Sequence, residues 1–171
     1  VGSLNDLQKR VRAIGPRRLL KSVIERYEAT GELATRETLE KISEEESFLF
    51  IDAEQAKVLF LSALTHGIDT RLWFEHVPQD TAWRILKEKL GDDDVDEYVI
   101  DLLADLHNKP AFELLESTLS EEKVASYAVE VMSRRETPQA VEFLARALKF
   151  QPLSVQAENA LVRLSKSKKH R

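Results

Sequence analysis

The chain has 171 residues, a net charge of −5, 43% hydrophobic residues and no cysteine. This length is enough for one domain with a sizeable core, and the lack of cysteine excludes disulfide bonds and thiolate chemistry. No uncharged apolar run of about 18 residues occurs, which excludes a transmembrane helix, so no membrane partner is expected.

Charge is distributed unevenly along the chain. Residues 1–21 and residues 162–171 each carry +5, which leaves −15 for the part between them. Basic clusters can neutralise nucleic-acid phosphates or pair with an acidic protein surface. The residues that would make such contacts near the N-terminus are Lys9, Arg10, Arg12, Arg17 and Arg18. The basic end Ser165–Arg171 is either a solvated terminus or an arm with the same role.

The first 50 residues predict three amphipathic helices. Apolar residues at 4, 7, 11 and 14 have helical spacing, and Gly15-Pro16 is expected to break that helix. A second helix covers about residues 19–27, and Thr35 is placed to cap a third that runs to Glu46. The start Val1-Gly2-Ser3 resembles a cloning scar, so we expect the sequence to be cut from a longer protein.

Residues 51–80 predict a core helix and a short helix. The apolar segment from Asp52 to Thr65 reads as a buried helix that ends at His66-Gly67, and Asp69 is expected to cap the short one. Trp73 in that short helix has no equivalent elsewhere in the chain, so its role is open. A base-stacking platform built from Trp73 and Trp83 is a weak hypothesis, because the acidic body repels phosphate.

From residue 82 the sequence repeats with a period of 29. The segments AWRILKEKL, AFELLESTL and AVEFLARAL begin at Ala82, Ala111 and Ala140, and their central leucines are Leu86, Leu115 and Leu144. The same register continues beyond each segment in three further columns: Val95/Val124/Leu153, Val99/Ala128/Ala157 and Leu103/Met132/Leu161. Self-similarity at this period predicts an all-α solenoid of stacked antiparallel helix pairs, each burying its apolar face against the next.

Helix start signals divide each repeat into two short helices. Thr137-Pro138 places a hydroxyl at an N-cap and proline in the first turn, and Pro110 and Pro152 also suit first-turn positions. Acidic residues stand where the partner helices should begin, at 92–94 and 120–122. About eleven helices and no strand are expected in total. Residues 1–50 are predicted to be a helical cap or degenerate repeats, and residues 51–171 the repeat region of one continuous domain.

These repeats resemble the HEAT-like repeat of the bilin-lyase subunit type over about residues 80–164. The resemblance rests on the alanine and leucine columns and on the proline that opens one helix of each pair. It implies an α-solenoid with a binding surface and no particular reaction. The family's Val-Arg at the start of the other helix is replaced by Val95-Asp96, Val124-Ala125 and Leu153-Ser154, so its Asp–Arg ladder between repeats is not expected.

No motif supports catalysis or metal binding. The four histidines lack metal-ligand spacing, serine occurs in no nucleophile motif, and five scattered glycines make no phosphate loop. We therefore predict a non-enzymatic, cytoplasmic scaffold that needs no cofactor or metal and binds another protein along the solenoid surface. The polar positions of the Ala-to-Leu helices would make that surface: Arg84, Lys87, Glu88, Glu113, Glu116, Ser117, Glu142 and Arg146. The alternative is a nucleic-acid-associated protein that uses the basic N-terminal helices and C-terminal tail.

Overall fold

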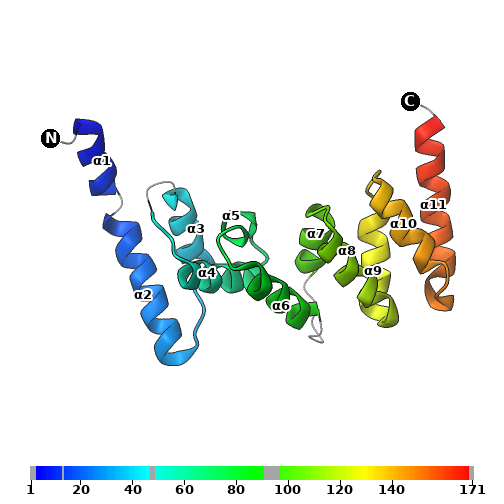
Figure 1. Ribbon diagram of the computed structural model, residues 1–171, viewed down its shortest axis with the longest axis horizontal. Coiled ribbons are helices and arrows are strands. Elements are labelled where there is room, and N and C mark those ends of the chain that lie inside the picture. Colours follow the sequence, from blue (N-terminus) through cyan, green and yellow to red (C-terminus); the bar gives the residue numbers. More distant parts are fainter. Residues whose placement is uncertain (1–2, 13, 47–48, 91–96, 170–171) are drawn as a thin grey trace. The chain divides into compact units, whose positions relative to one another are not determined.

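The computed structural model describes residues 3–12, 14–46, 49–90 and 97–169, and within them it contains eleven α-helices and no strand (Figure 1). Contacts group the chain into an N-terminal unit, Val1–Ile85, and a C-terminal unit, Leu86–Arg171, which are described separately. The helices are α1 Leu4–Arg12, α2 Ile14–Thr30, α3 Arg36–Glu44, α4 Ala53–His66, α5 Arg71–Phe74, α6 Gln79–Leu90, α7 Glu97–Asp105, α8 Lys109–Ser117, α9 Glu122–Ser133, α10 Pro138–Ala147 and α11 Ser154–Lys169.

The N-terminal unit is built around α4. This helix packs against α2, α3 and α5, and it buries seven of its side chains, Phe60 among them. Asp52 starts the helix with a capping box, in which its carboxylate accepts from the Gln55 amide and the Gln55 side chain accepts from the Asp52 amide. Gly67 ends it in the left-handed conformation, with φ 60°. These are the boundaries that the sequence predicts for the core helix.

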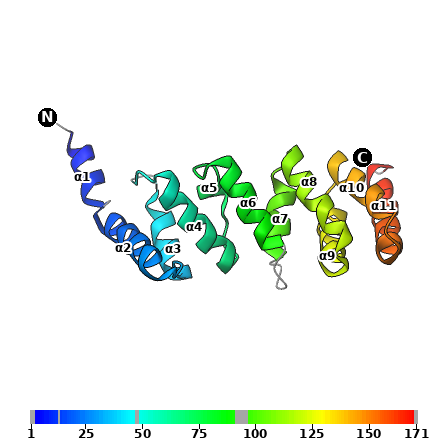
Figure 2. The same cartoon turned by 60° about the horizontal axis from the view of Figure 1, so that its bottom comes forward.

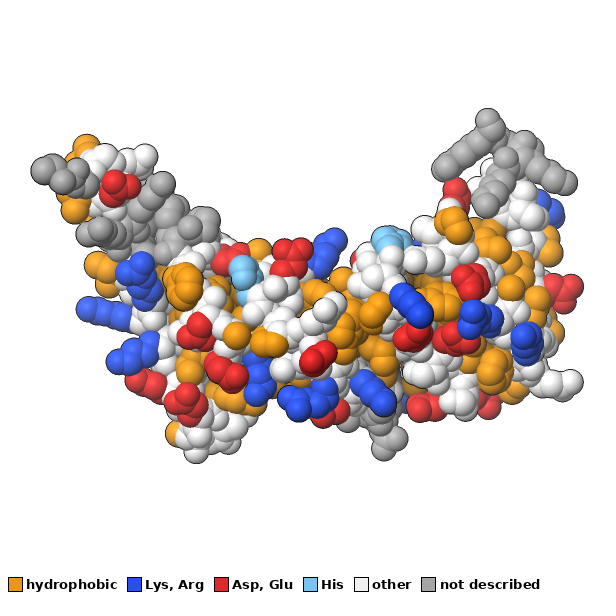
Figure 3. Space-filling model, viewed as in Figure 1, with side chains coloured by type: hydrophobic (Ala, Val, Ile, Leu, Met, Phe, Trp, Pro, Cys, Tyr) orange, Lys and Arg blue, Asp and Glu red, His pale blue; other side chains and the backbone are white. Residues whose placement is uncertain are grey.

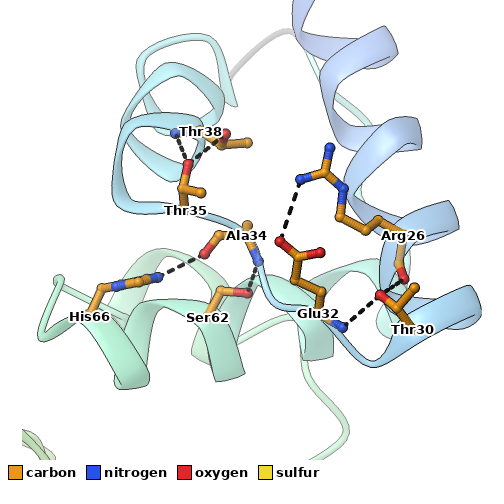
Figure 4. Close-up of polar contacts among 8 residues, drawn as sticks. All are labelled: Arg26, Thr30, Glu32, Ala34, Thr35, Thr38, Ser62 and His66. Atoms are coloured by element: carbon orange, nitrogen blue, oxygen red, sulfur yellow. Dashed lines mark hydrogen bonds and ion pairs between the residues drawn. The ribbon is translucent and has the colours of Figure 1, made fainter.

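The connection from α2 to α3 is held against α4 by the backbone of Ala34 (Figure 4). The Ala34 amide donates to Ser62 Oγ at 3.0 Å, and His66 Nε2 donates to the Ala34 carbonyl at 2.8 Å. Ser62 is fully buried, so this hydroxyl satisfies an amide that has no helical partner. Segments on both sides of residue 50 are thereby joined in one unit.

The C-terminal unit contains two sets of helices (Figures 1 and 2). In one set α9 packs against both α7 and α11, and in the other α10 packs against α8. Within pairs, α7 packs on α8 and α9 on α10, while α10 also contacts α11. Helices that follow one another in the sequence thus pack together, with short connections between them.

Alanine and leucine columns form the core. Leu86, Leu115 and Leu144 are each no more than 1% exposed, as the repeat register predicts. The column of Val99, Ala128 and Ala157 is completely buried. Small residues at those positions let neighbouring helices approach closely, which explains why alanine recurs there.

Polar contacts also join consecutive repeats, between residues about 30 apart. Arg135 forms ion pairs with Asp105 and, at 3.5 Å, with Asp101. Further along, Gln156 Nε2 donates to the Ser126 carbonyl at 3.1 Å. An aspartate–arginine link between repeats therefore exists at a position other than the one where the family resemblance would place it.

The structure differs from the sequence prediction at several helix ends. Gly15-Pro16 lies inside the first turn of α2 and does not separate two helices, since proline is accepted in a first turn. The N-cap position of α5 is Thr70, one residue after Asp69, but the Asp69 carboxylate does accept the amide of Arg71, the first residue of the helix, at 3.0 Å. Pro152 lies in a 3₁₀ turn, Gln151–Leu153, before α11. The predictions for Val95 and for the acidic residues 92–94 fall outside the described residues.

Candidate partner-binding groove

The helices α8 and α10 begin in the same way, 29 residues apart. Asn108 caps α8 by accepting the Ala111 amide at 2.9 Å, and Thr137 caps α10 by accepting the Ala140 amide at 3.1 Å. Each helix carries proline in its first turn. Because the two starts are equivalent, the same helix faces point outward in both repeats, and their polar positions fall side by side.

A groove of about 320 Å³ lies between the outer faces of α8 and α10. Four of the eight predicted partner-binding residues line it, namely Glu113, Glu116, Glu142 and Arg146. The other lining residues are Lys109, Phe112 and Gln139. Figure 3, in the same view as Figure 1, shows acidic and basic side chains next to one another over the region of α8 to α10.

Arg146 organises the groove. Its guanidinium forms ion pairs with Glu116 of the neighbouring repeat and, at 2.8 Å, with Glu142 one turn earlier on α10. These two carboxylates, Glu116 first, raise the pKa of Arg146 above its ordinary value. The same guanidinium lies 5.3 Å from the centre of the Phe112 ring, within the range of a cation–π contact. One side chain therefore holds two acids and an aromatic ring in fixed positions.

The third acid of the groove also has a partner. Glu113 lies 3.6 Å from Lys109 at the start of α8. The five charged groups of the groove thus sum to −1, and every carboxylate is paired. The surface of the groove is therefore nearly neutral, with charges of both signs.

Phe112 gives the groove an apolar wall. Its ring is half-buried and meets the buried Phe143 ring edge-on at 6.5 Å between centroids. Trp83 and Val141 stand at the equivalent position of the neighbouring repeats, one period before and after Phe112, and all three side chains are half-buried. The period of 29 reveals the column, yet it does not reveal how much of the column neighbouring side chains cover.

The remaining predicted partner-binding residues lie apart from this groove. Ser117 is exposed at the end of α8, and its hydroxyl donates to the Leu114 carbonyl at 2.6 Å. Arg84, Lys87 and Glu88 are exposed on one side of α6, at the junction of the two units.

The basic N-terminal residues occupy α1 and the first turns of α2. Arg17 and Arg18 are exposed on α2, while the side chains of Lys9, Arg10 and Arg12 fall outside the described part. The basic C-terminal segment continues α11 as helix up to Lys169.

Trp73 is not available as a binding platform. It is completely buried, and its Nε1 atom has no hydrogen-bond partner. The aromatic contacts near it run from Phe60 to Phe74 and on to Trp83, with centroids 5.6 and 5.7 Å apart. The short helix α5 therefore contributes to the core of the N-terminal unit, and stacking of a ligand on Trp73 is excluded.

Searches for other kinds of site and for relatives give no further assignment. Among the described residues no group of three or more His, Asp or Glu side chains could hold a metal ion. No helix in the described ranges has the length and apolar character needed to cross a membrane. Comparison with protein-family models, curated proteins and solved structures finds no match to this chain.

Proposed function

We propose that the chain is a non-enzymatic interaction module that binds another protein in the groove between α8 and α10. The observation that supports this is the groove itself, where the half-buried Phe112 ring stands beside a rim of paired charges fixed by Arg146. Partly exposed aromatic and arginine side chains in a recess are the kind of residues that contribute most to protein interfaces.

We further propose that the helix pairs form an α-solenoid of the HEAT-like type. The period of 29 residues, the recurrence of Leu86, Leu115 and Leu144 in the core, and the polar links between residues 30 apart support this. In such folds each repeat presents an equivalent outer face, so adjacent repeats build an extended surface. The groove between α8 and α10 would be one segment of that surface.

The chemistry of the groove supports one kind of partner over others. An apolar side chain would contact Phe112, and basic or amide groups beside it would reach the outer oxygens of Glu113 and Glu142, which are both exposed. Since the acids are already paired, a strongly basic partner would gain little electrostatic free energy from them. A segment of mixed charge with one apolar anchor fits best, and its charges would act mainly on association rate and specificity.

The test compares the proteins captured by the wild-type chain and by a charge-reversed groove, Glu113→Lys with Glu142→Lys. Both positions are exposed, so we expect the helical content to stay the same and the free energy of unfolding to change by about 1 kcal/mol or less. We expect specific partners identified by mass spectrometry to be lost. Glu116 is left unchanged because it is half-buried against Arg146, and reversing its charge would disturb the fold.

The matched control is Glu122→Lys with Glu158→Lys, which makes the same change of charge at exposed positions outside the groove. This variant should keep the partners of the wild type. Loss of the same partners in both variants would show that the effect is one of net charge, and retention of all partners in the groove variant would refute the proposed site.

A further inference from the structure

Arg146 fills, from within the chain, the place that a cation from a partner would take in the groove between α8 and α10. Its guanidinium pairs with the carboxylates of Glu116 and, at 2.8 Å, Glu142. It also lies over the Phe112 ring, 5.3 Å from the ring centre. Carboxylates and aromatic faces are the groups with which proteins bind guanidinium and ammonium ions. The chain therefore builds a cation site here and occupies it with its own side chain.

The rest of the chain would otherwise favour basic ligands at this groove. The part between residues 21 and 162 carries −15, and an acidic surface raises the local concentration of cationic ligands whatever their sequence. Without Arg146, one lysine and three glutamates would remain as the charged lining of the groove, and their charges would sum to −2. Arg146 thus withdraws two carboxylates from the ligands that the body of the protein attracts.

A cation supplied by a partner competes poorly with Arg146. Its guanidinium is tethered beside the two carboxylates, so its effective concentration there is on the order of millimolar or higher. Glu142 lies one turn before Arg146 on the same helix, which keeps this pair together as long as α10 is folded. A lysine or arginine from a partner would have to displace the Arg146 side chain, and it would gain only the contacts that Arg146 already makes.

The repeat itself does not require arginine at this position. One period before Arg146 stands Ser117, and one period before Glu116 stands Lys87. The register therefore places no comparable arginine–glutamate pair one repeat earlier, although the buried alanine and leucine columns recur there. The pairing of Arg146 with Glu116 belongs to this groove and not to the repeat in general.

We propose that Arg146 determines the specificity of the groove, because it excludes lysine- and arginine-rich segments and leaves the groove to partners with an apolar anchor and charges of both signs. This inference rests on the proposed function of the groove as a binding site. Such selection acts against the wrong partner by removing the contacts that it would make. The Phe112 ring, half-buried, and the exposed Glu113 and Glu142 remain for the right partner.

The test measures, by fluorescence anisotropy, how tightly the full chain binds a labelled peptide in which arginines flank a single leucine. Arg146→Gln removes the charge and keeps a good helix former. It should bind the peptide about tenfold more tightly than the wild type at low salt, because both freed carboxylates and the Phe112 ring then face the peptide. Arg146→Met, which keeps an apolar stem over the ring, should show the same gain, and added salt should reduce both gains.

Arg134→Gln is the matched control. Arg134 also pairs with a glutamate four residues earlier, Glu130, but it lies outside the groove. This variant has the same net charge as Arg146→Gln and should bind the peptide as the wild type does. Arg146→Lys keeps the cation and should restore most of the exclusion. Replacing Glu116 and Glu142 by glutamine in the Arg146→Gln protein should cancel the gain, with the helical content of every variant checked by circular dichroism.

The outcomes distinguish the role of Arg146 from the function of the groove. Equal affinity of the wild type, Arg146→Gln and Arg146→Met for the peptide would overturn the inference. An equal gain in Arg134→Gln would also overturn it, because the effect would then come from net charge. If the peptide shows no gain but the variant Glu113→Lys with Glu142→Lys still loses its captured partners, the groove keeps its function and only the role of Arg146 is rejected.

Discussion

Replacing Leu115 by alanine measures how much the leucine column stabilises the repeats. Leu115 is 1% exposed and lies on α8, which packs against α7 and α10. Loss of the buried carbons costs about 2–3 kcal/mol, and a cavity that the surrounding helices fill only partly adds more. We therefore expect the free energy of unfolding to fall by about 3–4 kcal/mol.

The assay is denaturation by urea, followed by circular dichroism and by tryptophan fluorescence. Both tryptophans, Trp73 and Trp83, lie in the N-terminal unit. Fluorescence therefore reports that unit alone, while circular dichroism reports both. If Leu115→Ala shifts the two transitions equally, the units unfold together; if it shifts only the dichroism, the C-terminal unit unfolds by itself.

Leu148→Ala is the matched control. This leucine closes the equivalent segment of the next repeat but is 39% exposed, so its truncation should cost clearly less. A Leu115→Ala variant that loses less than about 1 kcal/mol, or no more than Leu148→Ala, would refute the assignment of the leucine column to a tightly packed core.

Three other measurements address the caps, the tyrosine environment and the basic ends. Thr137→Ala removes the side chain that caps α10 and should cost about 1 kcal/mol of stability, whereas Thr65→Ala at an exposed site on α4 should stay within about 0.5 kcal/mol. Burial, together with Asp101 and Glu97, raises the pKa of Tyr127 to about 12. Because its pKa in the unfolded chain is about 10, the contribution of Tyr127 to stability is complete below about pH 10 and is lost between about pH 10 and 12. Tyr127→Phe should remove that part of the pH dependence and the phenol titration near pH 12 in ultraviolet absorbance. Binding of generic RNA or DNA should be weaker than about 1 µM at about 150 mM salt; tighter binding that Arg10→Gln, Arg12→Gln, Arg17→Gln and Arg18→Gln abolish would favour the nucleic-acid alternative.

The repeat register predicts the part of the structure that depends on apolar periodicity. Leu86, Leu115 and Leu144 are buried because each repeat must bury the same helix face. That requirement places leucine at the same position of every repeat, which is why the period of 29 residues reveals it. Thr137 caps α10 because cap chemistry is local, so it can be read from a few neighbouring residues. Leucine burial and helix capping can therefore be predicted without knowing which repeats are neighbours in the fold.

The groove could be predicted only in part. The register placed Glu113, Glu116, Glu142 and Arg146 on one outer face, and the structure brings these four together. It could not assign Arg146 to Glu116, because partner choice between flexible charged side chains depends on the packing of two helices in three dimensions. For the same reason the sequence could not show that each carboxylate of the groove is paired.

The polar links between repeats have a consequence for correct folding. The apolar columns are so similar that a helix pair could pack on the wrong neighbour with little loss of burial, a hazard typical of repeat proteins. The ion pairs of Arg135 with Asp105 and of Arg146 with Glu116 do not recur, however: one period after Asp105 and Glu116 stand Arg134 and Ala145. A pair that docked one repeat out of order would bury the same alanines and leucines but would leave Arg135 and Arg146 without their carboxylates. Burial of apolar residues thus stabilises the packing of the helix pairs, and the ion pairs that do not recur specify which pair packs against which.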